Sequence, residues 1–189
     1  MALLAVTATS PTHAVTATSP TPSSDSNVTL TGQQVKQAQV SDLPTPAWKI
    51  ALKFAMSKRG TPYVWGGTGN GGFDCSGLML RAYGKAGITL PRIAADQYSA
   101  FSRKIAWKDL RPGDLVFFHD FGHVGMVSRP GFMVDAPHTG DVVKEEPLSD
   151  WRRSSFAGAV RPDPKGVKQW VKQIKLRKTP APSMPTATL

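Results

Sequence analysis

The chain has few of the features expected of a membrane-spanning or disulfide-stabilised protein. Its 189 residues include a single cysteine, Cys75, so no internal disulfide can form. No run of 18 apolar residues occurs, which excludes a membrane-spanning helix. Hydrophobic residues make up 40% of the chain, enough for the core of one ordinary domain with flanking segments. The lone thiol is therefore either a small core residue or a reactive group.

Acidic residues are also scarce. Thirteen Asp and Glu stand against 23 Lys and Arg, giving a net charge of +10. More than half of this excess lies in residues 161–189, which carry seven cations and one anion. Such a basic segment suits an anionic partner, and an anionic wall polymer is the candidate we expect rather than nucleic acid. The simpler alternative is a solvated tail.

Three regions follow from the composition. Residues 1–44 contain AVTATSPT at 5–12 and again at 14–21, which is too poor in apolar bulk to pack, so we expect a low-complexity linker. Its Met-Ala-Leu-Leu-Ala-Val start resembles the end of a signal sequence but lacks a basic first region, so the export signal is incomplete. Residues 45–163 are the expected domain, and 164–189 are a basic, proline-containing tail expected to be flexible.

Hydrophobic spacing predicts an α+β domain, with helices first and antiparallel strands after them. One helix starts near Trp48 and stops at Gly60, and a second is capped by Asp74, begins at Cys75 and ends before Gly87. Strands are expected at 115–118, 123–128 and 132–136, with further strands at 142–143 and 156–160.

Cys75 has the setting of a nucleophile. It follows a glycine-rich loop and opens a helix, whose positive end favours the thiolate. The alternative is that the thiol simply packs on the apolar stripe of its helix. A backbone N–H of Cys75 and the hydroxyl of Tyr63 are candidate donors to an oxyanion, and Trp65 is expected to pack in the core or form a wall for the substrate.

A thiol needs a base, and His123 is the candidate because it begins a strand that would hold its imidazole rigidly. If residues 129–131 form a three-residue loop, Ser128 pairs with Phe132, and Asp135 lies one diagonal step from His123. A two-residue loop would place His138 there instead. Pro-Gly suits a type II turn, so we favour the longer loop and Asp135.

Six motifs then occur in unbroken order between about Trp48 and Val160: YVWGG at 63–67, FDCSGL at 73–78, LPR at 90–92, RPGDL at 111–115, GHVG at 122–125 and VDAP at 134–137. In this the chain resembles the NlpC-type cell-wall peptidases, a papain-like family. The resemblance implies an antiparallel sheet packed against the cysteine helix, and cleavage of peptidoglycan stem peptides, often between γ-D-glutamate and diaminopimelate.

The resemblance also implies roles for single residues. Cys75 matches the nucleophile, His123 the general base, Asp135 the orienting group, and Tyr63 the tyrosine near the oxyanion. Ser76 matches a position that helps to hold the substrate. The family often has histidine where this chain has Asp135. The remaining candidates for the substrate rim are Trp65, Asp74, Arg92 and His138.

We expect no metal and no cofactor, because the site supplies its own nucleophile, and we expect a secreted or wall-associated monomer. Three alternatives stay open. The same fold and chemistry serve a peptidoglycan amidase or an acyl transferase, and a non-catalytic wall-binding adaptor would act through its basic tail.

Overall fold

The computed structural model describes residues 44–178, so the predictions for 1–43 and 179–189 lie outside the described residues. The two helices that hydrophobic spacing predicted both precede the sheet in the described part of the chain. Helix α2 (Ala47–Ser57) buries Trp48, Ala51 and Ala55, and α3 (Cys75–Lys85) packs between α2 and the sheet. Two short helices were not predicted: α4 (Ala94–Ser99) and α5 (Asp150–Ser154). A single 3-10 turn, η1, spans Trp107–Asp109.

Between residues 44 and 178, five strands form one antiparallel sheet in the order β4-β3-β2-β1-β5. Their bounds are β1 Leu115–Phe118, β2 His123–Arg129, β3 Phe132–Asp135, β4 Lys144–Pro147 and β5 Phe156–Val160. The fourth strand lies two residues beyond the predicted 142–143. It is an edge strand of three half-buried charged residues and an exposed proline, so it lacks the β-branched apolar residues on which the prediction rested.

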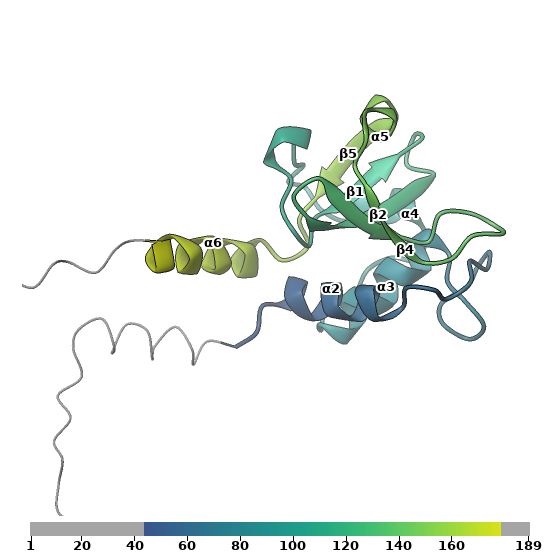
Figure 1. Ribbon diagram of the computed structural model, residues 1–189, viewed down its shortest axis with the longest axis horizontal. Helices are drawn as coiled ribbons and strands as arrows, with labels where there is room; N and C mark the ends of the chain where they lie inside the picture. The colour runs from purple at the N-terminus through teal and green to yellow at the C-terminus, as the bar shows by residue number, and fades with distance from the viewer. Residues whose placement is uncertain (1–43, 179–189) are drawn as a thin grey trace, which may run out of the picture.

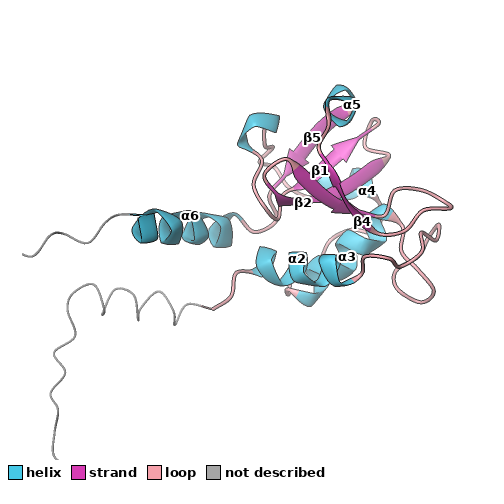
Figure 2. Cartoon of the chain, in the orientation of Figure 1, coloured by secondary structure: helices cyan, strands magenta, loops and turns pink. Residues whose placement is uncertain are grey.

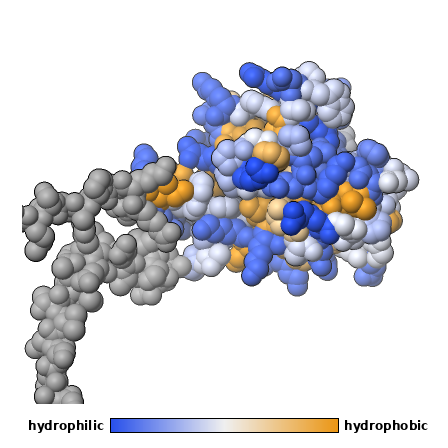
Figure 3. Space-filling view, in the orientation of Figure 1, coloured by the Kyte–Doolittle hydropathy of each residue, from blue (hydrophilic) through white to orange (hydrophobic). Residues whose placement is uncertain are grey.

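Helices α2 and α3 lie together on one side of the sheet (Figures 1 and 2). The main core fills the space between these helices and the sheet. There Leu78 and Met79 of α3 join Phe117, Val124 and Val134 of the sheet in one cluster. A second, smaller core contains Val116, Phe118 and Met133, which alternate with the first set along the strands. On the face seen in Figure 3 the surface is mostly hydrophilic, with small, separated apolar patches.

The expected C-terminal tail begins as a helix. Helix α6 (Pro164–Lys178) extends to one side of the domain (Figure 1). The Asp163 carboxylate caps the start of α6 by accepting a hydrogen bond from the Gly166 N–H at 2.8 Å. The same carboxylate accepts a hydrogen bond from the Trp48 N–H at 3.1 Å. Trp170 meets Trp48 edge to face with ring centroids 5.3 Å apart. These contacts attach the start of the tail to α2. Across residues 44–178, no helix is long and apolar enough to span a membrane.

Candidate active site

Cys75 is positioned by the aspartate that precedes it. Asp74 Oδ1 accepts a hydrogen bond from the Gly77 N–H at 2.7 Å, and its Oδ2 accepts one from the Gly66 N–H at 3.0 Å. One carboxylate therefore caps α3 and ties the glycine-rich loop to it. A Cβ at Gly77 would lie only 2.1 Å from the Gly67 carbonyl oxygen, so the close approach of loop and helix requires glycine. Cys75 remains 9% exposed at the helix start.

The turn that leads to the histidine's partner differs from the prediction. Arg129 pairs directly with Phe132, so the loop contains only Pro130 and Gly131. The predicted three-residue loop, with Ser128 opposite Phe132, was wrong. Gly131 has a φ of 79°, which with the preceding proline suits a type II turn. A type II turn fits poorly onto two regular strands, and an irregularity in the adjoining strand accommodates it.

A β-bulge between Val127 and Arg129 restores the predicted register before the strand reaches the site. The extra residue cancels the one-residue slip that a two-residue loop would cause, and His138 is not brought opposite His123. Instead His123 Nε2 lies 2.7 Å from Asp135 Oδ2. The expected contact between imidazole and carboxylate is present, although the turn that produces it was predicted incorrectly.

Burial and hydrogen bonding shift the pKa values of His123 and Asp135 in opposite directions. Burial lowers the pKa of His123, but its hydrogen bonds with Asp135 and with the Cys75 thiol outweigh that effect and raise its pKa to about 9. Because Nε2 faces Asp135, Nδ1 is the nitrogen left for the sulfur. Burial also raises the pKa of Asp135, which disfavours its charged form, whereas His123 lowers it. We take the pair as imidazolium and carboxylate, because a second cation, Arg152, lies beside the same oxygen.

Arg152 is a site residue that sequence reasoning missed. It belongs to α5, is 8% exposed, and places Nη2 3.6 Å from Asp135 Oδ2. The same nitrogen donates a hydrogen bond to Glu146 Oε1 on β4, and the guanidinium lies 5.3 Å from the centre of the Phe118 ring. A short helix with no recognisable motif gave no signal for it. Among the residues described, His123 is the one hydrogen-bond partner of the buried Asp135 carboxylate, and Asp135 Oδ1 has none, so the arginine supplies positive charge that this carboxylate otherwise lacks.

The site opens into a cleft of about 740 Å³. The cleft collects residues from the glycine-rich loop, the start of α3, the start of α4, the β1–β2 turn and α5. Asp135 does not line it, because the carboxylate is fully buried behind His123. All the other sequence-predicted candidates do: Tyr63, Trp65, Asp74, Cys75, Ser76, Arg92, His123 and His138.

Tyr63 and Arg92 provide polar groups on the Cys75 side of the cleft. Burial raises the pKa of Tyr63, and negative charge at Cys75 and Asp74 raises it further, so the phenol keeps its proton and can donate. Arg92 Nη1 donates to Asp74 Oδ1 at 3.1 Å and to Ser76 Oγ at 3.0 Å. Nη2 donates to Asp74 Oδ2, and the side chain, which is 37% exposed, lines the cleft.

Two predicted rim residues lie at the open edge. Trp65 is 86% exposed, so it forms a wall of the cleft and is not packed in the core. The His138 side chain is 74% exposed, and its nearest carboxylate is Asp141 at 3.8 Å. Within residues 44–178, no group of three His, Cys, Asp or Glu side chains is placed to hold a metal ion.

The turn between β1 and β2 is strained where it borders the cleft. His119, Asp120 and Phe121 have φ values of 50°, 50° and 68°, in the left-handed region that non-glycine residues rarely adopt. Such conformations cost about 1–3 kcal/mol each and are often found at functional sites. His119 and Phe121 line the cleft, so the strained turn forms part of its wall and leads directly into His123.

A helix-borne cysteine facing a strand-borne histidine across a cleft is the arrangement of a papain-like domain. The NlpC/P60 family matches residues 60–160, more than half of the chain, and the chain belongs to this family. A probable endopeptidase of Mycobacterium tuberculosis is 40% identical over 98 residues, covering 51% of this chain and 25% of the relative. A gamma-D-glutamyl-L-lysine dipeptidyl-peptidase of Bacillus cereus is 37% identical over 115 residues, covering 58% of this chain and 34% of the relative.

Solved structures agree with the fold. The crystal structure of an NlpC/P60 family protein from Bacillus cereus superposes with a TM-score of 0.58 at 36% sequence identity, covering 66% of this chain and 43% of that one. The chain spans about a quarter to a third of the length of the two relatives above. The similarity is therefore to one domain of longer proteins.

Proposed function

We propose that this chain is a cysteine peptidase that hydrolyses the stem peptides of peptidoglycan. The observation that carries the proposal is the meeting of Cys75 and His123 in one open cleft, with Asp135 bonded to the far nitrogen of the imidazole. A nucleophile, a base and a group that orients the base are the parts that acyl transfer through a covalent intermediate needs. The family and its named endopeptidases support the same reaction class.

The proposed reaction starts from a thiolate at Cys75 paired with the imidazolium of His123. The sulfur attacks the carbonyl carbon, and the resulting oxyanion accepts hydrogen bonds from the Cys75 N–H and the Tyr63 hydroxyl. That N–H belongs to the first turn of α3, where backbone donors have no partner within the helix. Imidazolium Nδ1 then gives its proton to the leaving amine, and a thioester remains on Cys75.

Water completes the cycle. Neutral His123 takes a proton from the water as its oxygen attacks the thioester, and the thiolate leaves with the peptide acid released. Asp135 stays charged throughout and holds the ring in one orientation, and Arg152 holds Asp135. The resulting imidazolium again pairs with the thiolate, so the ion pair is regenerated at each turnover.

Within stem peptides, the bond between γ-D-glutamate and diaminopimelate is the substrate we propose. Glutamate linked through its γ-carboxyl leaves a free α-carboxylate close to the bond that breaks. Arg92, held by Asp74 and Ser76, has a partly exposed cationic side chain on the cleft that suits such a carboxylate. The relative from Bacillus cereus is named for a gamma-D-glutamyl-L-lysine bond, which agrees with the glutamyl side of this choice and has lysine in place of diaminopimelate. Because this polymer lies outside the cytoplasmic membrane, the proposal places the protein in the secreted or wall-associated class.

The test is digestion of purified peptidoglycan of the diaminopimelate type, with fragments identified by mass. We expect fragments ending in D-glutamate and fragments starting at diaminopimelate from the unaltered protein, and none from Cys75→Ala. Ser57→Ala, at the exposed end of α2, is a matched control and should release the same fragments. Fragments cut between the glycan and the first alanine would indicate an amidase, and adducts to an added amine would indicate a transferase. Equal release by Cys75→Ala would refute the proposal.

A further inference from the structure

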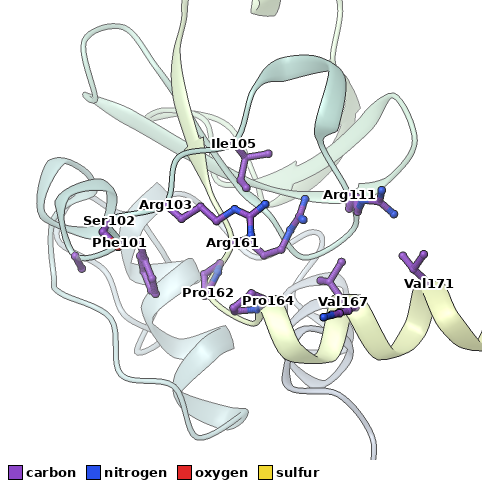
Figure 4. Close-up of a pocket in the computed structure, with 12 residues that line it drawn as sticks. Phe101, Ser102, Arg103, Ile105, Arg111, Arg161, Pro162, Pro164, Val167 and Val171 are labelled. Atoms are coloured by element: carbon purple, nitrogen blue, oxygen red, sulfur yellow. The ribbon is translucent and has the colours of Figure 1, made fainter.

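A second groove lies between the start of α6 and the segment that follows α4 (Figure 4). Its volume is about 620 Å³, and none of its lining residues lines the catalytic cleft. Apolar side chains supply part of its surface, including Phe101, Ile105 and Val171. Arg103, Arg111 and Lys168 are the exposed cations along it. None of the described residues that line it is Asp or Glu.

Nearly all the net charge of the chain belongs to the two segments that form this groove. Residues 100–111 and 161–178 together carry eleven cationic and two anionic residues. The other 159 residues carry twelve cations and eleven anions, and are close to neutral. Eleven cations minus two anions give these two segments nine of the chain's ten net positive charges, and a concentration of one sign attracts a partner of the opposite sign.

Some of these cations are already used within the fold. Arg161 pairs with the buried carboxylate of Asp114 through two contacts of 2.7 Å, and Lys104 donates to the carbonyls of Tyr98 and Phe101. The exposed cations of the groove differ from these. Arg103, Arg111 and Lys168 form no salt bridge with any side chain described in 44–175, so their charges are available to a ligand. Arg161, paired with Asp114, is the one groove-lining residue among the salt bridges formed by the described residues.

The position of α6 distinguishes between two kinds of anionic partner. A basic helix that binds a bilayer needs an apolar face free to enter it. Here Val167 is 2% exposed and Trp170 packs on Trp48, so the apolar face of the first turns of α6 is occupied by the domain. The unpaired cations border an open groove. This arrangement suits a flexible polyanion that lies along the groove better than a flat membrane surface.

We propose that the groove binds the phosphodiester chain of an anionic cell-wall polymer. Phosphate groups along such a chain suit Arg103 and Arg111, because a guanidinium can donate two hydrogen bonds to one phosphate. The carbon units between phosphates suit the apolar side chains of Phe101, Ile105 and Val171. The ligand would contact the groove through both its charge and its carbon skeleton.

Helix α4 connects this groove to the catalytic cleft. Ala94 and Ala95 at its start line the cleft, and Ala100 and Phe101 just beyond its end line the groove. Six helical residues span ~9 Å. A protein held in the groove by one wall polymer therefore keeps its cleft close to the same wall, which raises the effective concentration of stem peptides at Cys75.

The experiment measures binding with the full-length Cys75→Ala protein, so its outcome does not depend on the proposed peptidase activity. The probe is purified poly(glycerol phosphate), titrated in about 0.1 M salt. The groove variant carries Arg103→Gln, Arg111→Gln and Lys168→Gln. The matched control carries Lys53→Gln, Arg81→Gln and Lys85→Gln, three exposed cations of α2 and α3 outside the groove. We expect about tenfold weaker binding and a shallower salt dependence in the groove variant, and less than about threefold weakening in the control.

Three results would overturn the proposal. Equal weakening in both variants would show attraction by net charge alone. Unchanged binding in the groove variant would place the polymer elsewhere. Tighter binding to single-stranded DNA of equal charge, or to vesicles of phosphatidylglycerol and phosphatidylcholine, would identify a different class of partner. Circular dichroism of each variant checks that the fold is retained.

Discussion

Replacing Asp135 by Asn tests the electrostatic core of the proposed mechanism. The pKa of His123 is about 9 against an ordinary value of 6.5. That difference is ~2.5 units, or ~3 kcal/mol in favour of the imidazolium. Asparagine keeps the shape of the side chain but removes the charge, while the burial that lowers the histidine pKa remains. We therefore expect the pKa of His123 to fall by about one to three units in Asp135→Asn.

The assay is kcat/KM against pH on a soluble stem peptide. In the unaltered protein, activity should fall as pH rises through about 9, where His123 loses its proton and the thiolate loses its partner. In Asp135→Asn this fall should move to lower pH, and kcat/KM at pH 7.5 should drop by about 10²–10⁴-fold. In an NMR titration, the midpoint of the His123 ring resonances should shift to lower pH together with the fall in kcat/KM.

Glu145→Gln is the matched control for this substitution. Glu145 lies on β4 and bonds to Ser128 and Arg129, away from the imidazole, so its loss should leave the profile in place. A high-pH fall that stays near 9 in Asp135→Asn would refute the assignment of the raised pKa to Asp135.

Three further substitutions probe the surroundings of the site. Tyr63→Phe removes the proposed oxyanion donor and should lower kcat by about 10–10³-fold with little change in KM, measured by steady-state kinetics; an unchanged kcat would exclude that role. Gly77→Ala places a Cβ 2.1 Å from the Gly67 carbonyl oxygen and should destabilise the fold by about 2 kcal/mol or more in urea unfolding; a neutral result would mean that the loop moves at no cost. Arg152→Met leaves Asp135 without its second cation, so the high-pH fall in kcat/KM should become broader or shift. A purely structural role for Arg152 would lower the free energy of unfolding and leave the pH profile of kcat/KM unchanged.

Much of the local structure could be predicted because it depends on neighbouring residues. The cap at Asp74, the helix from Cys75 and the strands at 115–118 and 156–160 follow from patterns a few residues long. The contact between His123 and Asp135 could also be predicted, since alternation along a hairpin fixes which side chains share a face. The turn itself could not, because a bulge and a shorter loop compensate for each other and leave the same register further along the strands.

The sequence by itself pointed to the proposed nucleophile and base, Cys75 and His123, and determined the helix and strand that carry them, because each is marked by local spacing. Only the tertiary structure decided what surrounds them. Arg152 reaches Asp135 from a five-residue helix, and α6 docks through Trp170 on Trp48, a residue more than a hundred positions earlier. Segments 100–111 and 161–178 each look like ordinary basic surface, and the groove exists only where the fold brings them together. Long-range packing sets these contacts, and no short pattern encodes it.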